Sequence, residues 1–268
     1  MSIEAFSSSL CKSFRPATVF AVVCRNYVRS TVRNPSGPVL WLFPALIFGG
    51  AVSMIYLAAG ADELLPYAVA GTVAIGMWSS SLYSTTVAAM TDPWLGTDLV
   101  ISASPTQLST VVLSRAWTTA LAGTAAGGIA SIAVVALAHP PSLSINVVAL
   151  LITIPLGVLA VGSMAALACA LVMLMGARLG PIAVTDSAVV FLSAALFPVG
   201  VLGRLSPLSR LLSPYWVSRG ILHGISANAG DPELWQIAIA LLLLAAIQIV
   251  AASQVLFVIE NRLRRASQ

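Results

Sequence analysis

Long apolar runs separated by short polar connections dominate this chain. Each run is at least as long as the ~20 residues that a helix needs to cross the hydrocarbon core of a bilayer. A helix also satisfies its own backbone hydrogen bonds, as lipid requires. The pattern therefore predicts an all-α integral membrane protein with six transmembrane helices. The six runs cover residues 39–59, 66–90, 108–137, 145–175, 181–202 and 234–258.

The composition agrees with a protein whose main solvent is lipid. Hydrophobic residues make up 59% of the chain and charged residues only 8%, whereas about a quarter of the residues in a soluble domain are charged. Most of the 268 residues lie in or beside an apolar run, which leaves no room for a separate soluble domain of ordinary size. We therefore expect an N-terminal arm (1–38), a six-span domain (39–258) and a basic tail (259–268).

The placement of basic residues predicts the orientation of the chain. Of its 13 Lys and Arg residues, only Arg204, Arg210 and Arg219 fall on the side of the membrane opposite the termini. Because cytoplasmic loops carry the excess of Lys and Arg, we expect a multi-pass protein of the cytoplasmic membrane with both termini in the cytoplasm. The net charge of +4 is thus a sign of topology, and we expect no nucleic-acid partner.

The N-terminal arm has the pattern of an amphipathic helix. Arg25, Arg29 and Arg33 recur every four residues and share one face, while Val23 and Tyr27 fall on the opposite face. Such a helix lies along the inner membrane surface with its arginines toward anionic headgroups. It is interpreted either as a lipid anchor or as a contact surface for a cytoplasmic partner, and the two roles are compatible.

Two connections carry recognisable motifs. The cytoplasmic connection after the second run has an exposed Trp and an acid in a short predicted helix, followed by Ser-Pro. The connection after the fifth run is too apolar for a free loop and too broken for a span, which favours short re-entrant or interfacial helices. The residues are Trp94, Gly96, Thr97, Asp98, Ser104 and Pro105 in the first connection, and Phe197, Pro198, Pro207, Leu208, Ser213, Pro214, Tyr215, Trp216 and Arg219 in the second.

With these motifs in this order, the chain resembles the membrane subunits of type-2 ABC exporters, and within them it is similar to daunorubicin-type drug-resistance permeases. The family has six spans, an N-terminal connecting helix, a cytoplasmic coupling helix between spans two and three, and a broken helical hairpin between spans five and six. The resemblance implies a permease that moves a hydrophobic or amphipathic substrate, such as a drug, natural product or lipid, out of the cytoplasm or inner leaflet.

The resemblance also implies partners. The chain has no GxxxxGK[ST] loop to cradle phosphates, so ATP and Mg²⁺ would bind a separate P-loop ATPase subunit, in two copies, and this chain would not be an enzyme by itself. A second permease, identical or paralogous, would complete the complex. Contact with the ATPase is implied for Trp94, Gly96, Thr97, Asp98, Arg25 and Arg29, and the hairpin for Pro207, Pro214, Tyr215, Trp216 and Arg219.

Polar residues inside the runs are the remaining candidates. Ser80, Ser81, Ser84 and Thr85 lie in the second run; hydroxyls there either join neighbouring helices or line a substrate route. Asp186, in the fifth run, is either hydrated near the inner face or functional in the pathway. The chain carries no metal-ligand spacing and no catalytic set.

Two other functions remain open at this stage. An ion-coupled secondary carrier would use an ionisable residue inside the membrane, and Asp186 is the available one. A membrane scaffold without transport activity is the other.

Overall fold

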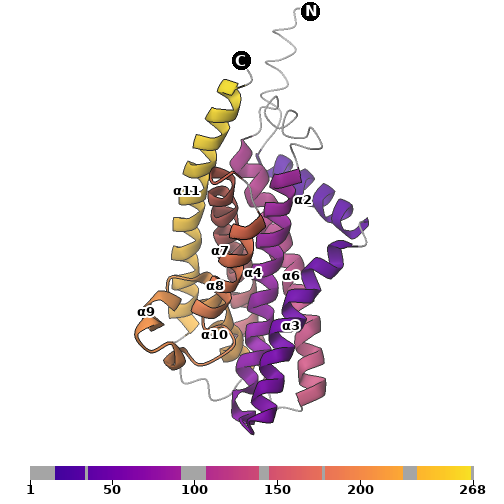
Figure 1. The fold of residues 1–268 in the computed structure, drawn as a ribbon, viewed down its shortest axis with the longest axis vertical. Helices are drawn as coiled ribbons and strands as arrows, with labels where there is room; N and C mark the ends of the chain where they lie inside the picture. Colours follow the sequence, from indigo (N-terminus) through magenta and orange to yellow (C-terminus); the bar gives the residue numbers. More distant parts are fainter. Residues whose placement is uncertain are drawn as a thin grey trace, which may run out of the picture.

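A computed structural model describes residues 16–33, 36–91, 107–138, 145–176, 179–225 and 234–266. Within these ranges the chain is helical and contains no strand (Figure 1). The longer helices are α2 (Pro16–Arg33), α3 (Ser36–Ala58), α4 (Leu65–Thr91), α6 (Leu108–Ala138), α7 (Val147–Leu174), α8 (Leu179–Leu192), α10 (Ser213–Ile225) and α11 (Leu234–Ala266). Short pieces are the 3₁₀ helices η1 (Asp62–Leu64) and η2 (Val199–Leu205) and the one-turn helix α9 (Ser206–Ser209).

Helix α4 is the centre of the bundle. It contacts α3, α6, α7, α8 and α10, and most of its residues are buried on every face. Trp78 and Met77 of α4 pack with Val161 of α7, Val217 of α10 and Leu241 of α11 in the larger apolar core. A smaller core joins α6, α7 and α11. A helix buried all round in this way needs neighbours on all sides, and the surrounding helices supply them.

The outer helices turn large apolar side chains away from the protein. Helix α11 alone exposes Trp235, Ile239, Leu243, Ile247 and Phe257. Contiguous apolar surface on this scale marks a face meant for lipid or for another protein. Among the described residues, three helical segments are long and apolar enough to cross a membrane, namely Leu108–Leu137, Val147–Leu174 and Leu234–Arg262. Leu42–Ala58 and Gly180–Leu192 are shorter apolar helices. The chain is therefore an α-helical protein with the character of a membrane protein.

Close approach of α4 and α6 depends on three glycines. A Cβ atom at Gly76 would lie 2.7 Å from the carbonyl oxygen of Gly123 and 2.9 Å from the Cα atom of Gly127. The GxxxG spacing in α6 thus serves tight helix packing. Ser131 adds a hydrogen bond across the same contact, from its hydroxyl to the carbonyl oxygen of Val69, at 3.0 Å.

The fifth apolar run is not one helix. The sequence predicts a helix over 181–202, but α8 ends at Leu192 and Ala194 has a positive φ of 47°. With 14 residues at 1.5 Å each, α8 is about 21 Å long, shorter than the ~30 Å core of a bilayer. The chain then turns through η2 and α9 and enters the bundle again as α10.

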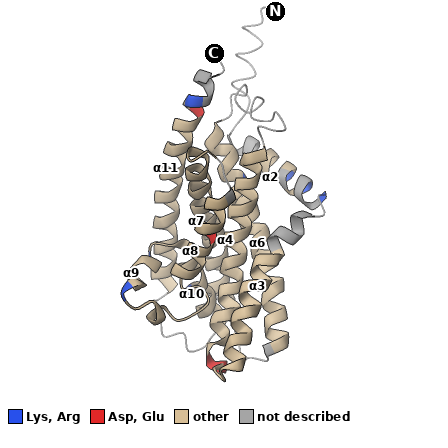
Figure 2. Ribbon diagram, in the orientation of Figure 1, with Lys and Arg blue, Asp and Glu red and all other residues tan. Residues whose placement is uncertain are grey.

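Helix α2 and the C-terminal end of α11 lie toward the same end of the bundle (Figure 1). In Figure 2 the ribbon is blue at basic residues of α2 and near the end of α11, where an acidic residue is also marked, and it is red at acidic residues of the opposite end, below α3 and α4. Helix α11 continues without a break past residue 258 to Ala266, so residues 259–266 of the predicted basic tail extend the last helix.

Candidate functional site

The hydroxyls of the second run are buried in the interior of the bundle. Ser80, Ser81 and Thr85 are fully buried, and Ser84 nearly so. The Ser81 hydroxyl donates to the carbonyl oxygen of Ala116 in α6, at 2.8 Å. In the single chain, this side chain joins neighbouring helices, as one of the two interpretations expects.

Asp186 belongs to the same interior. It is 4% exposed and accepts a hydrogen bond from the Ser79 hydroxyl at 2.8 Å, which ties α8 to α4. Trp78 and Tyr83 of α4 lie beside the same carboxyl. The side chain therefore faces protein rather than the water of the inner surface. A carboxyl group in such a place is costly and is retained for a reason.

Two neighbouring hydroxyls on α4 are buried without a partner in the described part of the chain. These are the hydroxyls of Thr85 and Thr86. The backbone carbonyl of Thr85, in contrast, accepts a weak hydrogen bond from the Cys169 thiol of α7, at 3.8 Å. Unpaired buried hydroxyls cost free energy, so a further hydrogen-bond partner at Thr85 or Thr86 would be stabilising. A substrate route along Ser80, Ser81, Ser84 and Thr85 stays a prediction.

Contacts with α3 and α4 fix the turn that follows α8. The Tyr56 hydroxyl of α3 donates to the carbonyl oxygen of Leu196 at 2.8 Å. Gly71 of α4 lies so close to the backbone of Ala195 that any side chain there would clash with it. The break in the fifth run, at Ala194 and four residues before Pro198, is thus stabilised by contacts with α3 and α4.

Helix α10 is anchored by an arginine. Arg219 is 4% exposed, and its Nη1 donates to the Tyr67 hydroxyl of α4 at 3.3 Å. Its guanidinium carbon lies 5.1 Å from the ring centre of Tyr67 and 5.5 Å from that of Tyr215. A cation held over two aromatic rings is stabilised while it is buried.

The other hairpin residues fix the ends of these short helices. Pro207 stands in the first turn of α9, and Pro214 is a buried residue at the start of α10. The Trp216 indole donates to the carbonyl oxygen of Arg210 at 2.8 Å and meets the Tyr215 ring edge to face. Of the hairpin residues predicted from sequence, Tyr215 therefore packs against both Trp216 and Arg219.

Helix α10 is also joined to its other neighbours. The Ser213 hydroxyl donates to Gln248 Oε1 of α11 at 3.1 Å, and the backbone N–H of Asn146, before α7, donates to the carbonyl oxygen of Gly224 at 2.7 Å. Gly220 packs on Thr153 of α7 with no room for a side chain. The segment 193–225 is thus an integral part of the bundle.

The predicted coupling residues are only partly described. Trp94, Gly96, Thr97 and Asp98 lie outside the described residues. Arg25 and Arg29 lie on α2 with exposed side chains, and α2 contacts α6 and α3. The helix predicted for the arm is present over Pro16–Arg33, and its place at a membrane surface stays a prediction.

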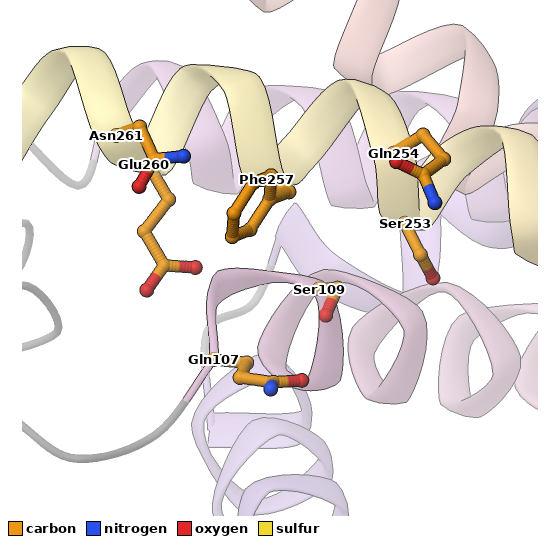
Figure 3. A pocket seen from close by; sticks show the side chains of 7 residues that line it. All are labelled: Gln107, Ser109, Ser253, Gln254, Phe257, Glu260 and Asn261. Atoms are coloured by element: carbon orange, nitrogen blue, oxygen red, sulfur yellow. The ribbon is translucent and has the colours of Figure 1, made fainter.

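A polar cavity that the sequence did not predict lies between α11 and the start of α6, at the end of the bundle that carries α2. Its volume is about 610 Å³, and Figure 3 shows side chains of α11 directed toward the first residues of α6. Glu260 Oε2 accepts a hydrogen bond from the backbone N–H of Leu108 at 3.1 Å and so caps α6. The lining residues are Gln107, Ser109, Ser253, Gln254, Phe257, Glu260 and Asn261.

The sequence holds a signal for this cavity. Ser253, Phe257, Glu260 and Asn261 recur at helical spacing on one face of α11. The predicted boundary between the last span and the basic tail falls at residue 258. It therefore separates Ser253 and Phe257 from Glu260 and Asn261, although all four share one face of α11.

The described residues contain no group of three or more His, Cys, Asp or Glu side chains that could hold a metal ion. Comparisons with models of known protein families and with curated proteins give no match for this chain. The candidate functional features of the described residues are the buried Asp186, the helix α10 with its buried Arg219, and the basic helix α2.

Proposed function

We propose that this chain is the membrane permease subunit of an ATP-driven exporter. In this proposal, the end of the bundle that carries α2 faces the cytoplasm, and the connection over residues 92–106 contacts a separate ATPase. Two permease chains and two ATPase subunits form the complex, and ATP and Mg²⁺ bind the ATPase. The substrate is hydrophobic or amphipathic and moves outward.

The observation that carries the proposal is the hairpin at the far end of the bundle. Helix α8 is too short to cross a bilayer and is followed by α10, which is buried against α4, α7 and α11. Non-helical backbone at membrane depth is tolerated only where protein or an aqueous cavity surrounds it. An element of this kind suits a protein that opens a path to the outer side better than a protein that only anchors a partner.

The position of the polar cavity between α6 and α11 also supports the exporter proposal. It lies beside Gln107, the first described residue after the proposed coupling connection. A push on that connection would reach α6 and α11 together, because Glu260 of α11 caps α6. Rigid-body movement of packed helices is an ordinary response to such a push.

The test is affinity purification of the chain in mild detergent from its own cells, followed by mass spectrometry. We expect a stoichiometric P-loop ATPase. Replacing residues 93–100 by a Gly/Ser linker should lower the recovered ATPase at least about tenfold, and Trp94→Ala should do so in part, as for a hot-spot aromatic. The matched control replaces residues 139–144, which the proposal places on the opposite side. Purification of the chain alone, or equal loss with both linkers, contradicts the proposal.

A second function is favoured by one observation. Asp186 is a buried carboxyl group whose polar neighbours among the described residues are Ser79, Trp78 and Tyr83, none of them cationic. This is the arrangement that an ion-coupled carrier needs. The chain alone in liposomes, with ethidium as probe and an imposed pH gradient, would then transport, and Asp186→Asn would abolish transport. Absence of transport by the chain alone excludes this alternative for the probe.

A further inference from the structure

An apolar groove with a basic rim lies between α2 and the bundle. Its volume is about 1000 Å³, at the upper end of the range for small-molecule sites. Helix α2 forms one wall, and α6 and α7 form the other. The lining residues are Cys24, Arg25, Val28, Arg29, Arg33, Trp117, Thr118, Leu121, Val158 and Leu159.

The α2 wall is strongly basic. Arg25, Arg29 and Arg33 stand one helical turn apart and all line the groove with exposed side chains. The described lining contains these three guanidinium groups and no carboxylate. Guanidinium forks bind phosphate oxygens in pairs, with greater strength than neutral hydrogen bonds. This wall therefore suits a phosphate group.

The opposite wall is apolar, and the polar side-chain atoms of Trp117 and Thr118 in it already have hydrogen-bond partners. Leu121, which is 59% exposed, lies there with Val158 and Leu159. The Trp117 indole N–H is held by the Ser163 hydroxyl at 3.0 Å and by the carbonyl oxygen of Leu159 at 3.2 Å. The Thr118 hydroxyl donates to the carbonyl oxygen of Ser114 at 2.7 Å. This wall suits a hydrocarbon chain.

The order of the two walls along the membrane normal matches one lipid molecule. Helix α2 lies toward the end of the bundle where α11 ends (Figure 1), and α6 runs from that end into the bundle. From Trp117 to Leu121, α6 descends about 6 Å. A ligand with its charge on α2 would thus have its tail directed along Leu121 toward the bilayer centre.

We propose that this groove binds one anionic glycerophospholipid from the leaflet at this end of the bundle. The phosphate lies among Arg25, Arg29 and Arg33, and one acyl chain lies along Leu121, Val158 and Leu159. The lipid fastens α2 to the bundle and so reinforces a weak hydrogen bond between α2 and α6, from the Cys24 thiol to the carbonyl oxygen of Ser114 at 3.8 Å. This site does not depend on the chain being an exporter.

The proposal is tested by native mass spectrometry of the full chain in detergent with one added compound at a time. The compounds are phosphatidylglycerol, phosphatidylcholine and glycerol phosphate. We expect one retained phosphatidylglycerol, with retention at least tenfold greater than that of phosphatidylcholine, and no retained glycerol phosphate. Equal retention of both lipids, or competition by glycerol phosphate at the same concentration as the lipid, overturns the proposal.

Variants separate the two walls. R25Q/R29Q/R33Q should lower phosphatidylglycerol retention at least tenfold, whereas R204Q/R210Q, which removes exposed arginines elsewhere, should leave it unchanged. Leu121→Trp together with Leu159→Trp fills the apolar wall without changing charge and should also abolish retention, which keeps the test valid if the triple arginine variant misfolds. Unchanged retention in the filled variant, or equal loss in R204Q/R210Q, contradicts the site. If the triple arginine variant instead keeps its lipid and loses a co-purified ATPase, the arginines contact that subunit and the lipid site is wrong.

Discussion

Helices α2 and α10 both pack beside longer helices of the bundle, yet they are attached in opposite ways. Nearly every residue of α10 is buried, and its side chains are bonded to α4 and α11. The described side chains of α2 are mostly exposed, and α2 reaches the bundle through α6 and α3. One helix is part of the core and the other lies on it.

The difference shows how a membrane protein uses polarity. In α10, Arg219 bonds to Tyr67 of α4 and Ser213 bonds to Gln248 of α11. These polar contacts hold a broken segment in an apolar interior. In α2, the arginines face a groove and need a partner from outside the described chain. The polar residues of α10 therefore stabilise the fold, whereas we propose that the arginines of α2 serve binding.

The largest expected effect comes from adding bulk to each helix. Gly220→Leu places a side chain of α10 against Thr153, where there is no room, and should lower the free energy of unfolding by about 3 kcal/mol or prevent folding. Ala21→Leu makes a similar addition on an exposed face of α2 and should change it by no more than about 0.5 kcal/mol. Unfolding by SDS titration measures both. Equal effects would show that α2 is packed as tightly as α10.

A smaller effect is expected from removing one arginine of each helix. Arg219→Leu loses the hydrogen bond to the Tyr67 hydroxyl and the contact with two rings, and should lower the free energy of unfolding by about 2 kcal/mol. Arg29→Leu, measured in detergent without anionic lipid, should leave it within about 0.5 kcal/mol.

Adding phosphatidylglycerol makes the arginine comparison sharper. It should stabilise the unaltered chain and Arg219→Leu more than Arg29→Leu, because a ligand stabilises only the state that binds it. A large loss of stability for Arg29→Leu in lipid-free detergent would place Arg29 in the fold rather than in a binding site.

The sequence predicted the long helices well and the short ones less well, for physical reasons. The apolar runs at 66–90 and 145–175 end within two residues of α4 and α7, because an apolar run ends where the chain meets water. The motif at Phe197 and Pro198 predicts a break in the fifth run, but α8 ends earlier, at Leu192. The causes of the earlier end are distant, since the Tyr56 hydroxyl and the missing side chain of Gly71 act on residues more than 100 positions later. The nearest local breaker, Pro198, lies six residues after Leu192.

Candidate site residues likewise divide into those with a local signal in the sequence and those that depend on distant residues. The composition of the run identified Asp186 as exceptional, but only its neighbour Ser79 on α4 decides whether it faces water or protein. The arginines of α2 were visible as one face because their four-residue spacing is local. The apolar wall that completes the groove comes from α6 and α7, about 90 to 130 residues away in the chain, and no local pattern connects the two walls.

The smallest expected effect is chemical and leaves stability unchanged. Cys24 lies half-buried on α2 and lines the groove, whereas Cys169 is fully buried between α7 and its neighbours. In a Cys11→Ser background, a water-soluble maleimide should label Cys24 in the folded protein, and Cys169 only after unfolding, because the thiolate must be accessible to react.

Intact-mass analysis counts the added groups over time, and Cys24→Ser is the matched control that should leave the folded protein unlabelled. If Cys169 reacts as fast as Cys24, the interior around α7 is open and the contrast between a core helix and a surface helix fails. Phosphatidylglycerol provides the final distinction. A lipid seated in the groove covers Cys24 and should slow its labelling, while phosphatidylcholine, which has no net charge for the arginines to hold, should not.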